Sequence, residues 1–231
     1  DTVQYFQWRK SRGSAEKFHG AVVDHVGHEN TRVFKDVADL GMKLEKLVHV
    51  VGTTVRPDVA IIYDWENLWA MNDAQGPRRG DKGYLDACRQ HYRAFWNRGI
   101  PVDVINVEQN LDAYKLVIAP MLYMLKADVD TRIATFVKNG GTFVTTYWTG
   151  IVDANDLCIL GGWPGGKLRQ VLGIWNEEID ALYPEDRNAI LPTPNNTLGL
   201  SGEYQAKDYC ALIHTETASV LAIYKKDFYA G

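Results

Sequence analysis

Residues 33–47 carry the clearest periodic pattern in the chain. Apolar side chains recur there at alternating spacings of four and three residues, and charged side chains fill the positions between them. This pattern predicts an amphipathic helix, which Asn30 or Thr31 can cap at its start. The apolar positions are Val33, Val37, Leu40, Leu44 and Leu47. Because residues 2–8 before it look like a strand, residues 1–50 are interpreted as strand, long loop and helix, one β/α unit.

Beyond residue 56 the pattern changes to short apolar runs that alternate with amphipathic segments. Residues 59–63 form a continuous apolar run, typical of a parallel strand buried on both faces. Further strands are predicted at 102–107, 115–119 and 142–147, helices around 85–96 and at 128–139, and a loop at 67–83. This alternation predicts a mostly parallel sheet with helices on both faces and right-handed crossovers.

The last third of the chain has a weaker pattern. Residues 148–200 are predicted to be irregular except for a short helix near 167–172. Two strands follow, at 208–214 and 219–224, and their short connection predicts an antiparallel hairpin at the edge of the sheet.

Composition and charge restrict the class of protein. The 231 residues are 46% hydrophobic and 23% charged, which is typical of a globular protein and excludes a disordered or disulfide-stapled chain. The formal net charge of −4 provides no overall attraction to nucleic acid or anionic lipid, so neither partner is predicted. The three cysteines are far apart and odd in number, which predicts reduced thiols in a cytoplasmic protein.

The predicted sheet lacks the motifs of nucleotide binding and of nucleophilic catalysis. No P-loop and no dinucleotide-binding glycine motif is present, and Pro164 interrupts the glycine cluster at 161–166, which favours a structural turn. The turns after the strands, at 63–67, 119–123 and 147–151, contain no Cys or Ser nucleophile. Cys88 and Cys210 fit a helix face and a strand as small core residues. We therefore predict no catalytic residue and no cofactor in this part of the chain.

Two other groups of residues leave their role open. His25, His28 and Glu29 lie close together, but a zinc site needs further fixed ligands, so a solvated loop is favoured and no metal is predicted. Four tryptophans fall on predicted loops that follow strands, where they serve either binding, an interface or ordinary packing. These are Trp65, Trp69, Trp148 and Trp163.

Glu16 and His19 stand three residues apart in the loop after the first predicted strand. If that strand belongs to a β/α barrel, the loop lies on the catalytic face. A carboxylate and an imidazole that converge there suit hydrogen bonding to sugar hydroxyls, although this spacing is common on any protein surface.

Several segments resemble glycoside hydrolase family 42 β-galactosidases, in the same order along nearly the whole chain. Residues 5–13 and 15–21, Tyr-Phe-Gln-Trp-Arg-Lys-Ser-Arg-Gly and Ala-Glu-Lys-Phe-His-Gly-Ala, resemble the end of the catalytic barrel. Residues 59–67, Val-Ala-Ile-Ile-Tyr-Asp-Trp-Glu-Asn, look like the start of the second domain. Its continuation is matched at 117–123, 139–144, 149–156 and 161–165.

The resemblance implies a domain organisation. Residues 1–50 would be the last strand, loop and helix of a (β/α)₈ barrel, and 51–57 a linker. Residues 58–231 would be a trimerisation domain with a flavodoxin-like or class I glutamine amidotransferase-like fold, and whether its final strand is included stays open. The chain would then be a piece of a longer polypeptide. Without barrel partners, residues 1–30 are expected to repack, swap or be poorly ordered.

The resemblance also implies a function. The parent enzyme would form a homotrimer and hydrolyse terminal non-reducing β-D-galactose with retention, through two glutamates and a covalent intermediate. Glu16 and His19 match the pair that binds the galactose ring. Both catalytic glutamates would lie before residue 1, so the chain alone is predicted to be inactive, and the family's zinc-binding cysteines are absent from this stretch. The alternative is a free-standing flavodoxin-like module for a flavin or nucleotide, based on the parallel sheet and the glycine cluster.

Overall fold

A computed structural model describes residues 2–76 and 80–230 of the chain. It divides into two compact units, residues 1–55 and 56–231. The helices are α1 (Arg32–Glu45), α2 (Trp65–Asp73), α3 (Tyr84–Trp96), α4 (Val129–Lys138) and α5 (Leu168–Leu172), with a 3₁₀ turn at Val48–Val50. The strands are β1 (Val59–Ile62), β2 (Val102–Ile105), β3 (Leu116–Ala119), β4 (Met124–Leu125), β5 (Thr142–Thr145), β6 (Val152–Asp153), β7 (Ile174–Ala181), β8 (Asn188–Pro192), β9 (Tyr204–Ala206), β10 (Tyr209–Thr215) and β11 (Ala222–Tyr224).

The first unit contains the predicted amphipathic helix. Thr31, one of the two caps that the sequence offered, caps α1 by accepting a hydrogen bond from the Phe34 N–H. No residue of α1 is buried, so its apolar stripe packs only partially within the unit. The predicted strand at 2–8 is not formed, and an isolated bridge between Arg9 and Val23 takes its place. An extended segment without neighbouring strands has no ladder to join, which agrees with the expectation that this region repacks.

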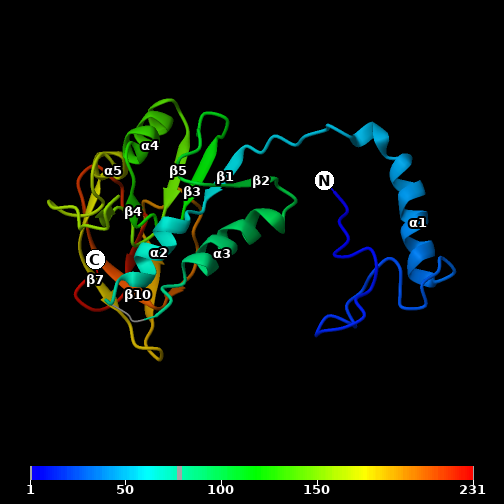
Figure 1. Cartoon of the computed structure of the whole chain (residues 1–231). Helices are drawn as coiled ribbons and strands as arrows, with labels where there is room; N and C mark the ends of the chain where they lie inside the picture. Colours follow the sequence, from blue (N-terminus) through cyan, green and yellow to red (C-terminus); the bar gives the residue numbers. More distant parts are fainter. Residues whose placement is uncertain (1, 77–79, 231) are drawn as a thin grey trace. The chain divides into compact units, whose positions relative to one another are not determined.

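A four-stranded parallel sheet organises the second unit, in the order β2-β1-β3-β5 (Figure 1). Because side chains alternate along a strand, Ala60 and Ile62 face a core with α4 and α5, whereas Ile61 faces a core with α2 and α3. The predicted parallel sheet with helices on both faces is confirmed. Parallel pairing also brings the carboxyl ends of β1, β2, β3 and β5 to one edge of the sheet.

Two predictions about local structure are wrong. Residues 67–83 are not all loop, because α2 occupies Trp65–Asp73. Asp64 accepts a hydrogen bond from the Asn67 N–H at 3.0 Å and so starts this helix, although the Asn-rich sequence resembles a loop. Trp65 and Trp69 therefore lie on a helix.

The predicted hairpin of 208–214 with 219–224 is also wrong. β10 pairs with β7, and β11 pairs with β8, both antiparallel. The partner strands lie within residues 148–200, which were predicted to be irregular but contain β6, β7 and β8. The carbonyl of Gly173 accepts the N–H groups of Glu216, Thr217 and Ala218, and this joins the start of β7 to the end of β10. These strands add a two-stranded and a three-stranded antiparallel sheet to the unit.

Candidate functional site

The carboxyl edge of the parallel sheet is the usual ligand-binding position in this kind of fold. Open α/β sheets bind ligands at this edge, at the point where the strand order reverses. Here that point lies between β1 and β3, which are neighbours although β1 connects onward to β2. The turn after β1 carries Asp64, and the turn after β3 carries Met121, which has a positive φ of 45°. A side chain at such a strained turn is the position of a nucleophile in hydrolases. A thioether has no O–H or S–H proton that a base could remove, so Met121 cannot act as such a nucleophile.

Asn67 of α2 closes the space between the two strands. Its buried side-chain amide donates to the Met121 carbonyl at 3.0 Å and accepts from the Met124 N–H at 2.9 Å. Both partners are backbone groups of residues 121–124, which lead from β3 into β4. Buried backbone groups need such partners, and the Met121 carbonyl also accepts from the Tyr123 N–H at 2.7 Å. Asn67 thus fixes α2 to residues 121–124, at the point where other open α/β sheets bind a ligand.

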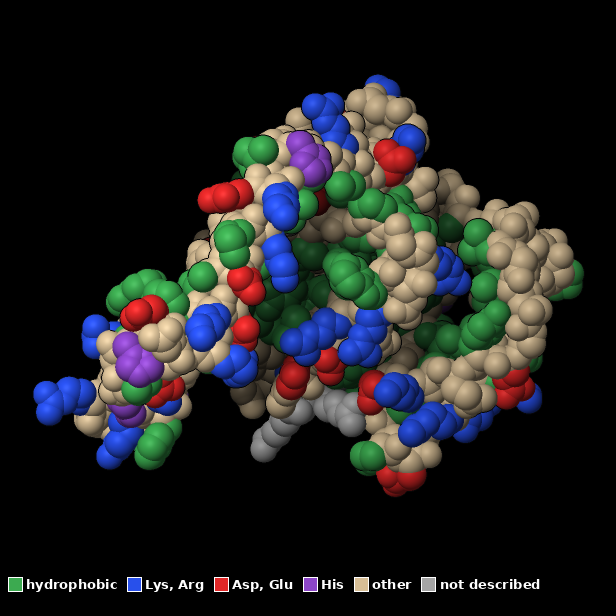
Figure 2. Space-filling model, turned by 90° about the vertical axis from the view of Figure 1, so that its right-hand side faces the viewer, with side chains coloured by type: hydrophobic (Ala, Val, Ile, Leu, Met, Phe, Trp, Pro, Cys, Tyr) green, Lys and Arg blue, Asp and Glu red, His purple; other side chains and the backbone are tan. Residues whose placement is uncertain are grey.

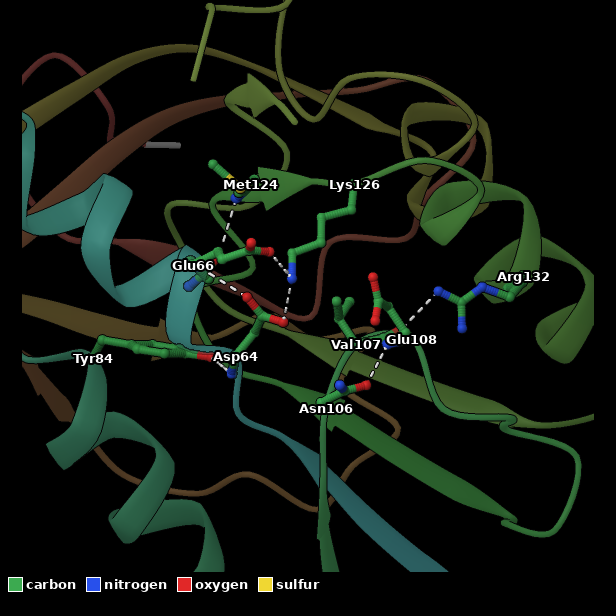
Figure 3. Close-up of polar contacts among 10 residues, drawn as sticks. Asp64, Glu66, Tyr84, Asn106, Val107, Glu108, Met124, Lys126 and Arg132 are labelled. Carbon is green, nitrogen blue, oxygen red and sulfur yellow. Dashed lines mark hydrogen bonds and ion pairs between the residues drawn. The ribbon is translucent and has the colours of Figure 1, made fainter. Parts of the chain in front are cut away.

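Lys126 completes the closure with a buried ion pair. Figure 3 shows its ammonium between the carboxylates of Asp64 and Glu66, with 2.9 Å to Asp64. The side chains of Lys126 and Asp64 are only 14% and 4% exposed. Burial disfavours the charge on Lys126, but its hydrogen bonds to Glu66 and Asp64 raise the pKa of the ammonium above its ordinary value. Lys126 therefore stays charged and bonded at neutral pH.

The turn after β2 is held in a similar manner by α4. Figure 3 shows that Arg132 donates to the Val107 carbonyl, at 2.7 Å, and that the Asn106 side chain accepts from the Glu108 N–H, at 2.7 Å. Arg132 also donates to the Gln109 carbonyl at 3.1 Å. Polar side chains at this edge thus bind backbone groups and one another.

These contacts argue against the flavin or nucleotide alternative. A phosphate is normally held by free N–H groups at a helix N-terminus. At α2 that place is taken by the Asp64 carboxylate, and beyond the glycine cluster Asp130 accepts from the Lys167 N–H at 2.8 Å. Carboxylates of the chain thus already occupy the N–H groups that a phosphate would use at these two positions. Residues 161–166 form turns and bends around an isolated bridge at Trp163.

The structure divides the four loop tryptophans into two kinds. Trp148 is buried in the core beside α2 and α3, and Trp163 packs partly against the same core. Trp65 and Trp69 remain 61% and 60% exposed on α2. Sequence alone could not separate them, because all four follow strands in similar aromatic segments.

Glu16 and His19 share one exposed turn of the first unit. The His19 N–H donates to the Glu16 carbonyl at 3.0 Å, which places both side chains on the same short segment. The His19 ring lies edge-on to Phe6 with 5.9 Å between centroids. Their proximity suits joint contact with one sugar, and their role remains a prediction.

Two of the three residues weighed as metal ligands, His25 and His28, have other partners. His25 shares a 2.7 Å hydrogen bond with the Ser11 carbonyl, and His28 accepts from the Asn30 N–H at 3.1 Å. Over residues 2–76 and 80–230, no three His, Cys, Asp or Glu side chains gather in a manner suited to a metal ion.

Surface charge and helix length are the features that concern nucleic acid and membrane as partners. On the face shown in Figure 2, basic and acidic side chains are interspersed rather than separated by sign. Within the described part of the chain, each helix is too short or too polar to cross a membrane.

The cysteines differ sharply in access. Cys88 and Cys210 are buried and Cys158 is exposed. Burial raises the pKa of the Cys88 thiol to about 12, and burial also raises that of Cys210. At pH 8 about one Cys88 in ten thousand would be a thiolate, which is the reactive form. We expect iodoacetamide to modify Cys158 in the native protein and the other two only after unfolding in urea, as measured by peptide mass spectrometry. Rapid native labelling of Cys88 would contradict this placement.

The fold defines a mixed α/β domain in which, over the described residues, Asn67 and Lys126 occupy the sheet edge between β1 and β3. Residues 57–231 match the family model of the β-galactosidase trimerisation domain, and residues 1–47 match that of β-galactosidase. The chain therefore belongs to the β-galactosidase trimerisation-domain family and covers that region of the GH42 β-galactosidases, together with the end of their catalytic domain.

Individual β-galactosidases are similar to this chain over nearly its whole length. β-Galactosidase Pbg of Clostridium perfringens is 63% identical over 231 residues, which are all of this chain and 33% of that protein. The crystal structure of a cold-adapted β-galactosidase from Rahnella sp. R3 has a TM-score of 0.90 at 58% identity, over 99% of this chain and 34% of that one. Gan42B, a GH42 β-galactosidase from G. stearothermophilus, has a TM-score of 0.88 at 50% identity over 99% of this chain and 32% of its own. The chain spans about a third of the length of these relatives.

Proposed function

We propose that this chain is part of a retaining β-galactosidase that hydrolyses terminal non-reducing β-D-galactose. Residues 58–231 would serve subunit trimerisation, with a flavodoxin-like or class I glutamine amidotransferase-like sheet that has lost ligand binding. The observation that carries the proposal is the match to the trimerisation-domain family over residues 57–231. The closed sheet edge supports it, because Asn67 bonds the domain's own backbone there and Lys126 pairs with the carboxylates of Asp64 and Glu66.

Residues 1–50 would be the last strand, loop and helix of the catalytic barrel, joined by a linker at 51–57. The unburied apolar stripe of α1 supports this assignment, because the outer helices of a barrel bury that stripe against strands and neighbouring helices. Glu16 and His19 would then hydrogen-bond the galactose ring and orient it, without transferring a proton to the glycosidic oxygen.

The proposal is tested by comparing the purified chain with the longer protein that carries it. Light scattering after size exclusion should give the longer protein three times the mass of its chain, and it should hydrolyse a chromogenic β-galactoside. The 231-residue chain should show no turnover, since by resemblance neither catalytic glutamate lies within it. Clear hydrolysis by the chain would refute the assignment of the site, and a monomeric longer protein would refute trimerisation.

A further inference from the structure

The outward face of α2 carries two large aromatic side chains that the rest of the described unit leaves uncovered. Trp65 and Trp69 are one helical turn apart, with 6.5 Å between ring centroids, and are 61% and 60% exposed. Indole rings are costly to leave in water, because each offers a large apolar area. We call the exposed surface of these two rings the α2 aromatic face.

This face stands on a rigid support. The inward side of α2 is fixed by the Asp64 cap, by Asn67 to the segment after β3, and by Lys126. Trp65 also packs edge-on against Tyr63 at 5.3 Å, and Tyr63 stacks on the buried Tyr84 at the same centroid distance. Two exposed rings on a helix held this firmly lose little conformational freedom when a partner covers them, which is the condition for tight association.

The charge beside the rings is also neutralised within the chain. Glu66, between the two tryptophans in sequence, contacts Lys126, so its carboxylate does not face a partner unpaired. Interface hot spots are enriched in tryptophan and poor in unpaired charge. The two indole rings beside the paired carboxylate of Glu66 have both properties.

Resting on the proposed trimerisation, we infer that the α2 aromatic face contacts a second copy of this chain. The partner is chosen because these rings lie within the residues that match the trimerisation family. A closed ring of three identical chains is heterologous, so the face of one protomer meets a different surface of the next. The α2 aromatic face is thus one half of each interface.

The test is the double variant Trp65→Ala/Trp69→Ala in the longer protein that carries this chain. Loss of hot-spot tryptophans should raise the dissociation constant of the assembly by about 30-fold or more. Sedimentation over a dilution series should show dissociation at concentrations where the unaltered protein is a trimer. Because the two rings are exposed, the far-ultraviolet circular dichroism spectrum should not change.

The matched control is Tyr183→Ala, which removes a 72% exposed aromatic ring beyond the end of β7 and should leave the mass unchanged. If the unaltered protein is a monomer, both trimerisation and this inference fail. If the double variant stays a trimer with unchanged affinity, the inference alone fails. If the double variant keeps its trimer affinity but melts at a lower temperature, the α2 aromatic face packs against another part of the same protomer. If the double variant keeps its trimer affinity but no longer binds a β-galactan, the α2 aromatic face is a sugar-binding surface.

Discussion

Replacing Asp64 by alanine is expected to lower the free energy of unfolding of this chain by about 3 kcal/mol. The carboxylate caps α2, a contribution of about 1 kcal/mol. It also pairs with Lys126 at 2.9 Å, where the side chains of Lys126 and Asp64 are only 14% and 4% exposed, and loss of Asp64 leaves the largely buried charge of Lys126 partly uncompensated. The expected loss of unfolding free energy lies at the low end of the range for a broken buried ion pair, because Glu66 continues to contact Lys126. Equilibrium urea denaturation followed by circular dichroism would measure the change.

A surface ion pair provides the control for Asp64. The charged atoms of Lys115 and Asp58 are 2.8 Å apart, close to the 2.9 Å of the Asp64–Lys126 pair, but the side chains are 79% and 61% exposed. Asp58→Ala should therefore cost no more than about 1 kcal/mol. Equal losses for the two variants would show that the Asp64–Lys126 pair is not buried as the structure places it.

The variant Glu16→Ala should reduce kcat/KM for a β-galactoside by about 100-fold in the longer protein, given the proposed role in galactose binding. A hydrogen bond between a charged group and a sugar hydroxyl contributes about 1.5–3 kcal/mol, and its loss leaves the bound sugar less well oriented. Steady-state kinetics would measure the effect. The mass of the assembly should not change, because Glu16 lies outside the residues matched to the trimerisation domain.

Glu29→Ala is the control for Glu16, since it removes another exposed carboxylate of the same unit. It should leave kcat/KM within about two-fold, as expected of a solvated side chain. Unchanged kinetics for Glu16→Ala would remove Glu16 from the galactose site while leaving the family assignment intact.

The sequence predicted the framework of the second unit because its signals are local. The apolar run of β1 and the apolar periodicity of α3 and α4 reflect which faces of each single element are buried. The four-stranded parallel sheet with a helix layer on each face could therefore be derived from these patterns. The predicted cap of α1 by Asn30 or Thr31 had the same local origin, and the structure shows that Thr31 is the cap. The site residues Glu16 and His19 came from resemblance, since a carboxylate and an imidazole three apart carry little information alone.

The sequence missed α2 because its deciding residues are polar. Asn67 looks like a loop residue, yet in the fold it is buried and satisfies two backbone groups of a segment more than fifty positions away. The partners of β10 and β11 were missed for a related reason. A strand pattern predicts that a strand forms, whereas its pairing depends on which edges meet in space.

By itself, then, the sequence determined the family resemblance, the parallel sheet and the absence of nucleophiles from its turns. Only the tertiary structure decided that Asn67 and Lys126 close the ligand edge of the sheet. It alone separated Trp65 and Trp69 from the packed Trp148 and Trp163. Burial and buried polar pairing are properties of contacts between distant segments, and residue type and local periodicity carry no record of which segments meet.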